Sequence, residues 1–296
     1  MRLTGVMPPI TTPFEGGEVA LERLKENFQK WNRTGLSGYL VLGSNGESVY
    51  LNEKERLSVV EVSREAIPPS KLMLVGTGME STRETIRFSN HVAEMGADYA
   101  LVVTPSYFKD SMKPRILYDH FTSVADSSRI GVLIYNVPKF TGINMEPDLV
   151  ARLSEHPNIV GVKDSSGNIG QLSEIVHLSQ RGFAVFTGSA PVFFPALCVG
   201  AAGGILAATN VVPQEFCTIQ ALFHQGKLEE ARALQNRLTP LAKAVTARFG
   251  IGGLKIAMDY AGYFGGEPRA PLQKPGKDAE EELRLLLAEA KNPKSA

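Results

Sequence analysis

A lysine ends an otherwise apolar segment in the middle of this 296-residue chain. The segment Ile159-Val160-Gly161-Val162 is typical of a strand buried on both faces, so Lys163 would hold its amine in poorly solvated surroundings. Burial disfavours the charged form of an amine, and a neutral lysine amine can attack a ketone carbonyl to form an imine. The alternative is a lysine that extends to solvent or pairs with Asp164. Its position at the end of a central segment favours imine chemistry.

Two hydroxyl-bearing residues could carry the proton transfers that imine formation requires. Tyr135 ends the apolar segment before that of Lys163, and a phenol there can donate and accept a proton. Ser44 lies in the turn Gly43-Ser44-Asn45-Gly46-Glu47, where it could relay that proton. The glycines of this turn would allow backbone N–H groups to approach a carboxylate closely. Taken alone, Tyr135 could equally be a core aromatic residue, and the turn is an ordinary one.

Other catalytic chemistries find less support in the sequence. The five histidines form no cluster, and Glu174 and His177 have helical spacing without a third metal ligand. Gly76-Thr77-Gly78 lacks the rest of a dinucleotide-binding fingerprint, and the chain contains neither a Walker phosphate loop nor a G-x-S-x-G nucleophile elbow. The sequence therefore predicts no metal site.

The charge balance and the apolar pattern restrict the class of protein. Lys and Arg together number 31, as do Asp and Glu, so no basic excess indicates nucleic acid or an anionic membrane. The sequence has no run of 18 apolar residues and no leader-like segment, which predicts a soluble, cytoplasmic protein. We expect Cys198 and Cys217 to be reduced and buried.

Eight short apolar segments recur along the chain, each followed by small residues and a helix-like pattern. They cover residues 5–11, 38–44, 72–78, 98–105, 131–138, 159–165, 184–189 and 203–210. Apolar strands that alternate with helices favour a parallel sheet covered on both faces, and eight such units predict an α/β fold, the (β/α)₈ TIM barrel. We expect this barrel over residues 1–225 and a C-terminal helical extension over residues 226–296, packed on the barrel as one domain overall.

Helix signals lie between these segments. Asn52-Glu53-Lys54-Glu55 and Ser81-Thr82-Arg83-Glu84 have the spacing of capping boxes. A helix predicted after residue 20 would bury one apolar face, made of Leu21, Leu24, Phe28 and Trp31. In a (β/α)₈ barrel the chemistry sits at the carboxyl ends of the strands, and Lys163, Tyr135 and Ser44 all fall at such predicted ends.

Four motifs occur in order at the predicted strand ends: G-S-N-G-E at 43–47, V-T-P-S-Y at 103–107, Y-N-V-P at 135–138 and G-V-K-D-S at 161–165. Together they resemble the dihydrodipicolinate synthase/N-acetylneuraminate lyase family, and the similarity extends from Pro8 to Leu272. Within that family the chain is most similar to 4-hydroxy-2-oxoglutarate aldolase. This closer resemblance rests on Ser44-Asn45 and on residues 245–251 and 262–266.

The resemblance implies a role for each candidate residue. Lys163 would form the imine with the 2-oxo carbon, and Tyr135 would shuttle protons and deprotonate the 4-hydroxyl group during retro-aldol cleavage. Ser44 would link Tyr135 to Tyr107, which in this family reaches into the active site of a neighbouring subunit. The substrate-binding residues would be Ser44, Asn45, Gly46, Ser165, Gly188, Ser189 and Ile205. The family is usually a homotetramer, a dimer of dimers, and needs no metal or organic cofactor.

The resemblance predicts a class I aldolase that cleaves 4-hydroxy-2-oxoglutarate reversibly to pyruvate and glyoxylate. The synthase branch of the family carries an arginine two residues after the proline of Y-N-V-P, where this chain has Phe140. That difference argues against condensation of pyruvate with aspartate semialdehyde. The alternatives are a 2-keto-3-deoxy sugar acid aldolase or dehydratase, a dihydrodipicolinate synthase-like condensation of pyruvate with an aldehyde, and a non-catalytic barrel that binds 2-oxo acids as a sensor.

Overall fold

The computed structural model describes residues 3–291 of the chain. These residues form two compact units. The first unit comprises Met73–Ile205 together with residues 3–4, and the second comprises Gly5–Leu72 together with residues 206–291. Both units contain strands as well as helices.

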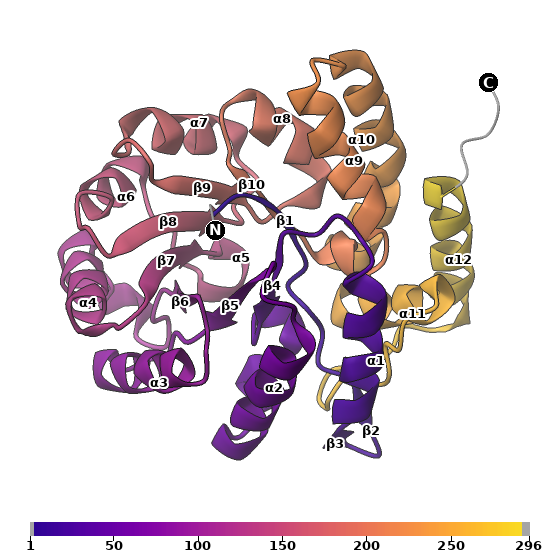
Figure 1. Cartoon of the computed structure of the whole chain (residues 1–296), viewed down its shortest axis with the longest axis horizontal. Helices are drawn as coiled ribbons and strands as arrows, with labels where there is room; N and C mark the ends of the chain where they lie inside the picture. The colour runs from indigo at the N-terminus through magenta and orange to yellow at the C-terminus, as the bar shows by residue number, and fades with distance from the viewer. Residues whose placement is uncertain (1–2, 292–296) are drawn as a thin grey trace. The chain divides into compact units, whose positions relative to one another are not determined.

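A parallel sheet forms the centre of the first unit (Figure 1). Its strands follow one another in chain order, and each pairs in parallel with the next. They are β5 (Leu72–Gly76), β6 (Tyr99–Val103), β7 (Gly131–Asn136), β8 (Ile159–Asp164), β9 (Ala184–Thr187) and β10 (Gly203–Ile205). The helices between them are α3 (Thr82–Glu94), α4 (Pro114–Ser127), α5 (Pro138–Thr141), α6 (Pro147–Leu153), α7 (Ile169–Leu178) and α8 (Phe193–Cys198). The alternation of strand and helix is the one that the apolar segments predict.

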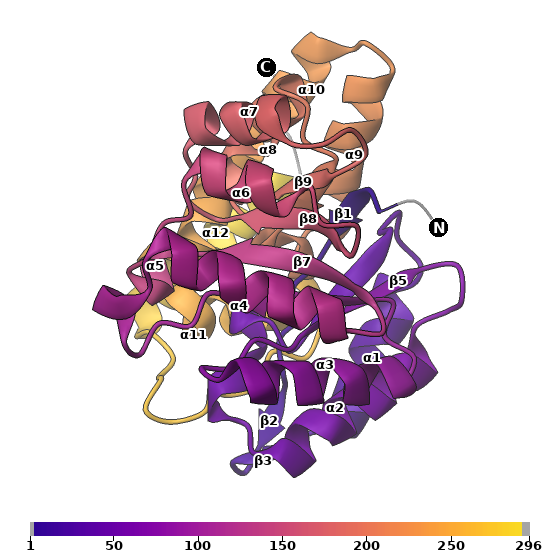
Figure 2. The same cartoon turned by 90° about the vertical axis from the view of Figure 1, so that its left-hand side faces the viewer.

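The sheet of the first unit buries one face against a layer of helices. Figure 2 shows α3, α4, α6 and α7 of that layer following one another. The core between sheet and helices includes Val102, Ile134, Val162 and Val185, one from each of four successive strands. Because successive side chains of a strand point to opposite faces, the residue that follows each of these four in its strand points away from the helices. Lys163 follows Val162 and therefore belongs to that other face.

The second unit contains the strands β1 (Gly5–Met7) and β4 (Gly38–Val41). An isolated parallel bridge joins Pro9, just after β1, to Leu40 of β4. Its helices are α1 (Leu21–Trp31), α2 (Glu53–Ala66), α9 (Pro213–His224), α10 (Leu228–Lys243), α11 (Gly250–Ala261) and α12 (Lys277–Lys291). A short hairpin that the sequence pattern does not predict, β2 (Phe14–Glu15) paired with β3 (Glu18–Val19), precedes α1. The C-terminal part of the described chain is thus helical, as predicted, while the division at residue 225 stays a prediction.

The local helix signals give mixed results. The buried face of α1 carries Leu24, Phe28 and Trp31, as predicted. The Asn52 side chain accepts from the backbone N–H of Glu55, and the Glu55 carboxylate accepts from the N–H of Asn52, so this capping box is confirmed. The second predicted box is wrong, because the Ser81 side chain makes no capping hydrogen bond. Thr85 stabilises that first turn instead, through a hydrogen bond from its hydroxyl to the Ser81 carbonyl.

Two further expectations concern the surface of the described chain. Within residues 3–291, no helix combines the length and the apolar character that crossing a membrane requires. The expectation that both cysteines are buried is wrong for Cys198, which is exposed at the last position of the short helix α8. Cys217 of α9 is half-buried, and burial raises the pKa of its thiol to about 11.

Candidate active site

Lys163 is buried at the end of β8, with 3% of its surface exposed. In the parallel ladder it stands between Tyr135 of β7 and Phe186 of β9. The adjacent Val162 and Val185 belong to the helix-facing core, so Lys163 and Phe186 point to the opposite face of the sheet. The structure therefore places the amine among apolar and aromatic side chains, as its position in the sequence predicts.

Burial weakens the preference of this amine for its charged form. The Nζ atom of Lys163 lies 4.3 Å from the centre of the Tyr135 ring. Desolvation lowers the pKa of Lys163, and the neighbouring Tyr135 side chain opposes part of that shift. A lysine with a lowered pKa has a larger fraction of neutral, nucleophilic amine at a given pH. The two residues that the sequence singles out for imine chemistry thus lie side by side.

Gly188 keeps open the space beside Lys163. A Cβ atom at this position would lie 1.8 Å from Ser165 Oγ and 3.1 Å from Lys163 Cε, so a larger residue would displace both side chains. The backbone N–H of Gly188 donates to the Asp164 carbonyl at 2.7 Å, which holds the end of β9 against β8. Lys163, Ser165 and Gly188, three of the predicted site residues, therefore lie together.

Ser189 and Ile205 occupy the neighbouring strand ends of the same unit. Ser189 follows Gly188, and its backbone N–H donates to Thr187 Oγ1 at 3.2 Å. Ile205 ends β10, the strand that pairs with β9, and is fully buried. Ser189 is half-buried, as is Ser165. This side of the site therefore combines apolar surface with two hydroxyl groups.

The Asp164 carboxylate accepts hydrogen bonds from side chains other than Lys163. Asn136 Nδ2 and Gln171 Nε2 donate to its Oδ1 atom at 2.7 and 3.2 Å, and Ser166 Oγ donates to its Oδ2 atom at 2.5 Å. Adjacent residues of a strand point to opposite faces, so these partners lie on the helix-facing side. The described contacts of Asp164 therefore give no support to the alternative in which Lys163 forms an ion pair with it.

The described contacts of Tyr107 do not include Lys163. Its side chain is 79% exposed and meets Phe108 edge to face, with ring centres 5.0 Å apart. The loop that carries it is anchored by Glu80, whose Oε2 atom accepts from the backbone N–H groups of Ser106 and Tyr107, both at 2.9 Å. A rigid loop thus presents an exposed aromatic pair at the surface of the first unit.

The turn at residues 43–47 belongs to the second unit and has an unusual backbone. Leu42 and Glu47, on either side of its 3₁₀ turn, have φ angles of 56° and 53°. Residues other than glycine seldom adopt this left-handed conformation, and for a bulky one such as leucine it is strained. Such strain clusters at functional sites. Ser44 and Asn45, the predicted carboxylate-binding residues, are half-buried in this turn.

A buried ion pair fixes the far end of this turn. Lys255 Nζ lies 2.6 Å from Glu47 Oε1, and 0% and 1% of the two side chains are exposed. Lys255 also donates to the Thr12 carbonyl at 2.9 Å, while Thr12 Oγ1 donates to the Gly46 carbonyl at 2.7 Å. The backbone N–H of Arg269 donates to Glu47 Oε2 at 2.8 Å. Burial lowers the pKa of Lys255, and the Glu47 charge opposes that shift.

Sequence reasoning missed this pair, although the chain carries a signal for it. Lys255 is a single lysine within the apolar run Leu254–Met258 of α11, where all five residues are buried. That is the same anomaly that identifies Lys163. The partner Glu47 could not be inferred in the same way, because it stands 208 positions away in the sequence and in a turn where an acidic residue is ordinary.

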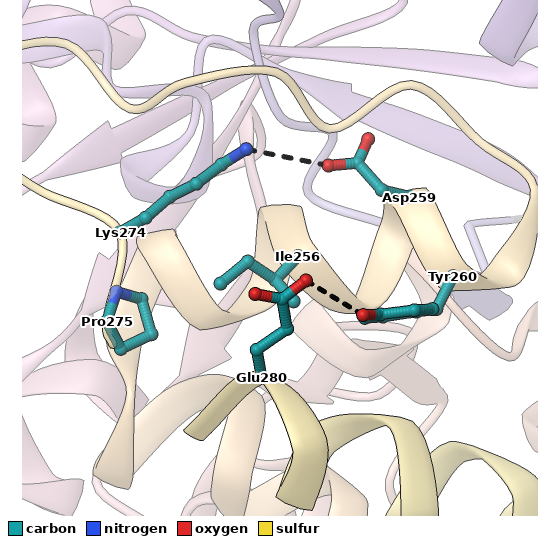
Figure 3. Close-up of a pocket in the computed structure, with 6 residues that line it drawn as sticks. All are labelled: Ile256, Asp259, Tyr260, Lys274, Pro275 and Glu280. Atoms are coloured by element: carbon teal, nitrogen blue, oxygen red, sulfur yellow. Dashed lines mark hydrogen bonds and ion pairs between the residues drawn. The ribbon is translucent and has the colours of Figure 1, made fainter. Parts of the chain in front are cut away.

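A surface pocket of about 330 Å³ lies between α11 and the start of α12 (Figure 3). Its polar groups bind one another, since Lys274 Nζ lies 3.7 Å from Asp259 Oδ2 and the Tyr260 hydroxyl donates to Glu280 at 2.8 Å. None of the predicted site residues lines it. Within residues 3–291 no three His, Cys, Asp or Glu side chains are grouped to hold a metal ion. The candidate active site is therefore the surroundings of Lys163.

Comparison with known sequences finds close relatives over the full length. Residues 2–290 match the dihydrodipicolinate synthetase family model. The 4-hydroxy-tetrahydrodipicolinate synthase of Methanothrix thermoacetophila is 37% identical over 286 residues, covering 96% of this chain and 95% of that protein. A protein of Emericella nidulans named "probable 4-hydroxy-2-oxoglutarate aldolase, mitochondrial" is 36% identical over 293 residues, covering 97% of this chain and 94% of the relative.

Solved structures of this family have the same fold. Dihydrodipicolinate synthase from Thermotoga maritima superposes with a TM-score of 0.94 at 32% identity, over 98% of this chain and 99% of that one. A prophage protein of the dihydrodipicolinic acid synthase family from E. coli K12, solved in complex with pyruvate, gives 0.90 at 26% identity, over 98% and 99%. The predicted (β/α)₈ barrel with C-terminal helices is thereby confirmed. By sequence and by fold, the chain belongs to the dihydrodipicolinate synthetase family of pyruvate-dependent class I lyases.

Proposed function

We propose that Lys163 forms an imine with the 2-oxo carbon of pyruvate, and that the enzyme makes or breaks a carbon–carbon bond at the adjacent methyl carbon. The observation that carries this proposal is the buried Lys163 amine, 4.3 Å from the ring centre of Tyr135. An imine at C2 accepts the electron pair that carbon–carbon cleavage leaves on C3. A free carbonyl would stabilise the same carbanion far less.

In the proposed steps Tyr135 is the side chain that exchanges protons directly with the substrate. The Lys163 amine attacks C2 and passes one of its protons to the former carbonyl oxygen. The Tyr135 phenol supplies the second proton, so that the oxygen leaves as water and Tyr135 becomes a phenolate. Tyr135 then takes a proton from C3, which converts the iminium to an enamine. The enamine carbon attacks the aldehyde carbon, and the new alkoxide takes the proton from Tyr135. Water then hydrolyses the imine and frees Lys163; cleavage runs through the same steps in reverse.

The remaining predicted residues are proposed to bind the substrate. Ser44 and Asn45, with Gly46, would hold the pyruvate carboxylate, and the strained backbone at Leu42 and Glu47 on either side of this turn supports a functional role. The rest of the pocket would be lined by Ser165, Gly188, Ser189 and Ile205. Tyr107 is proposed to act, through Ser44, in the site of a neighbouring subunit of a homotetramer. Its side chain is 79% exposed, which supports an action outside its own subunit.

The names of the relatives favour condensation of pyruvate with an aldehyde as the first candidate reaction. Most of the similar proteins are named 4-hydroxy-tetrahydrodipicolinate synthase, at 32–37% identity. Condensation and aldol cleavage differ in direction and in the aldehyde, while the chemistry at Lys163 is common to both.

Cleavage of 4-hydroxy-2-oxoglutarate to pyruvate and glyoxylate is the second candidate, and one observation favours it. Phe140 is 60% exposed in α5 at the position where the synthase branch carries its arginine. The adjacent Lys139 has its Nζ atom 5.7 Å from the centre of the Phe140 ring. An aromatic ring cannot form the charge-assisted hydrogen bonds that an arginine makes with a carboxylate. Nor does it offer hydrogen bonds to the hydroxyl groups of a sugar acid, which disfavours that alternative.

Borohydride trapping tests the proposal. Incubation with pyruvate, reduction and peptide mass mapping should locate one adduct, on Lys163, and Lys163→Ala should abolish both the adduct and turnover. Wild-type protein that binds pyruvate without an adduct would support the sensor alternative and refute the imine mechanism. Product formation from pyruvate with aspartate semialdehyde, compared with pyruvate release from 4-hydroxy-2-oxoglutarate and from sugar acids, separates the candidate reactions.

A further inference from the structure

The relative position of Tyr135 and Lys163 depends on how β7 and β8 pair. The ladder between these strands shifts register between Val132 and Leu133. Pairing at the start of the strands therefore does not set the pairing at their ends. From Leu133 onward only four residue pairs remain, and the last two are Tyr135 with Lys163 and Asn136 with Asp164.

The last pair of this ladder is joined by its side chains as well as by the backbone. Asn136 Nδ2 donates to Asp164 Oδ1 at 2.7 Å, and both side chains are buried, with 0% and 1% exposed. The backbone N–H of Ser165 donates to the Asn136 carbonyl at 2.8 Å and closes the ladder just beyond. The hydrogen bond between Asn136 and Asp164 thus ties together the residues that directly follow Tyr135 and Lys163.

Further donors fix each member of this pair. Gln171 of α7 and Ser166 donate to the Asp164 carboxylate, and the backbone N–H of Met145 donates to Asn136 Oδ1 at 3.0 Å. Asn136 Nδ2 also donates to Asn144 Oδ1 at 3.0 Å. Burial raises the pKa of Asp164, and its hydrogen bonds from Ser166, Asn136 and Gln171 oppose that shift. The network therefore anchors the strand ends to α7 and to the loop after α5.

Neither Asn136 nor Asp164 can touch a substrate bound at Lys163. Their side chains lie on the helix-facing side of the sheet, whereas Tyr135 and Lys163 point to the other face. Any effect on the reaction must pass through the backbone of the two strands. They can act only as positioning residues.

We infer that the hydrogen bond between Asn136 and Asp164 positions the Tyr135 hydroxyl for proton transfer at an imine on Lys163. This inference rests on the proposed function, because it assumes the imine and the proton transfer. Proton transfer requires its two heavy atoms within hydrogen-bond reach, so a small shift between β7 and β8 slows it strongly. The equilibrium amount of imine tolerates such a shift, because the covalent bond forms at a flexible lysine side chain.

An exchange of the two side chains tests the inference. Asp164→Asn places two amides, and Asn136→Asp two carboxylates, across the strands, while the double variant Asn136→Asp/Asp164→Asn restores one amide and one carboxylate with the same total charge. Two quantities are measured with pyruvate alone: the Lys163 adduct in a brief borohydride pulse at saturation, and the rate of hydrogen–deuterium exchange at C3 followed by NMR. The first reports the imine population, and the second reports proton transfer.

We expect each single variant to keep the adduct within about twofold and to lose roughly 20-fold in exchange rate. That is less than the roughly 10²–10⁴-fold that a positioned acid–base group contributes, because Tyr135 is displaced and not removed. The double variant should recover the exchange rate to within about threefold of wild type, in line with a restored hydrogen-bonded pair. Equal losses of adduct and exchange in the single variants would overturn the inference. A double variant that folds and exchanges no faster than the single variants would overturn it as well.

Asn158 provides the matched control, at the opposite end of β8. Its side chain donates to the carbonyls of Ala125, Ser128 and Ile130, so Asn158→Ala also removes a hydrogen-bonded amide directly next to this strand. We expect a lowered Tm with an unchanged ratio of exchange to adduct. A ratio that falls in this control as it does in Asp164→Asn would show a general loss of stability and refute the positioning role. Absence of any wild-type adduct on Lys163 would instead refute the proposed function itself.

Discussion

Lys255 and Glu47 form an ion pair of 2.6 Å in which neither side chain contacts solvent appreciably. The pair holds the turn that carries Ser44 and Asn45 from the side of α11. A charge buried in this way is stable only while its partner is present. A helix that follows the barrel strands thus fixes the geometry of a turn that precedes most of them and that is proposed to bind the substrate.

Removal of one partner should cost far more stability than removal of both. Lys255→Met leaves the Glu47 carboxylate buried without its cation, and we expect a loss of about 3–5 kcal/mol in the free energy of unfolding. The double variant Glu47→Gln/Lys255→Met buries no charge and should lose clearly less. Urea unfolding followed by circular dichroism measures both. Equal losses in the single and double variants would mean that the pairing of the charges contributes little.

Gly188→Ala should weaken the binding of pyruvate at Lys163. The added methyl group would lie 1.8 Å from Ser165 Oγ and 3.1 Å from Lys163 Cε, so both side chains would have to move. We expect trapping at Lys163 to need at least about tenfold more pyruvate, which corresponds to roughly 1.4 kcal/mol. Gly276→Ala is the matched control, because its Cβ would meet no atom within 4 Å. Unchanged half-saturation in Gly188→Ala would show that this space is not part of the site.

The rate of imine formation should depend on pH through the lowered pKa of Lys163. The amine attacks only when neutral, so the rate rises with pH and levels off above the pKa. Because burial lowers that pKa below its ordinary value of 10.5, the half-maximal rate should occur below pH 10.5. Borohydride trapping in a series of buffers measures the midpoint. A rate that is still rising with unit slope at pH 10.5 would contradict the burial of a neutral amine.

Acid should destabilise the protein partly through His120. This side chain is buried in α4 with its Nδ1 atom 2.8 Å from Thr82 Oγ1, and burial lowers its pKa to about 4. In the unfolded chain a histidine titrates near 6.5, so between these values the unfolded state binds a proton that the folded state does not. Stability should therefore fall by roughly 3 kcal/mol as the pH drops from 6.5 to 4.

The contribution of His120 is isolated by replacement with a neutral side chain. Whatever its stability at pH 7, the His120→Gln variant should lose less stability than wild type between pH 6.5 and 4. Urea unfolding at several pH values compares the two slopes. Parallel slopes would assign the acid sensitivity to other groups of the described chain.

The sequence predicts those parts of the structure that a local pattern determines. Lys163 is conspicuous in the sequence because burial of a charged side chain in an apolar strand costs free energy unless the charge is paired or the group becomes neutral. Asn52 and Glu55 were predicted to form a capping box from their spacing alone, and they do. The spacing at Ser81 is equally suitable, but the side-chain hydrogen bonds at this helix start come from Thr85, which donates to the Met79 and Ser81 carbonyls. Competing local hydrogen bonds of this kind cannot be ranked from residue types.

The parts that escaped prediction depend on residues far apart in the sequence. The network of Asn136 and Asp164 includes Gln171 from a helix and Asn144 from a loop, and each of these is an ordinary polar residue in its own segment. The Glu47 partner of Lys255 is likewise invisible until the turn and α11 are placed. Long-range pairing of buried polar groups is therefore where sequence patterns carry least information, because each member alone looks like a surface residue.

The register shift between Val132 and Leu133 also bears on how this protein can change over evolutionary time. It separates the entry of β7 and β8 from the four residue pairs that end in Asn136 and Asp164. A lineage that lengthens or shortens the loop before Gly131 can absorb the difference at this irregularity, with the pairing of Tyr135 and Lys163 left in place. Substitutions at the start of β7 and β8 are therefore less constrained by selection on the residue pairs at the end of these strands. The same arrangement marks the entry loops as the segments in which an engineer can vary length with least risk to the chemistry.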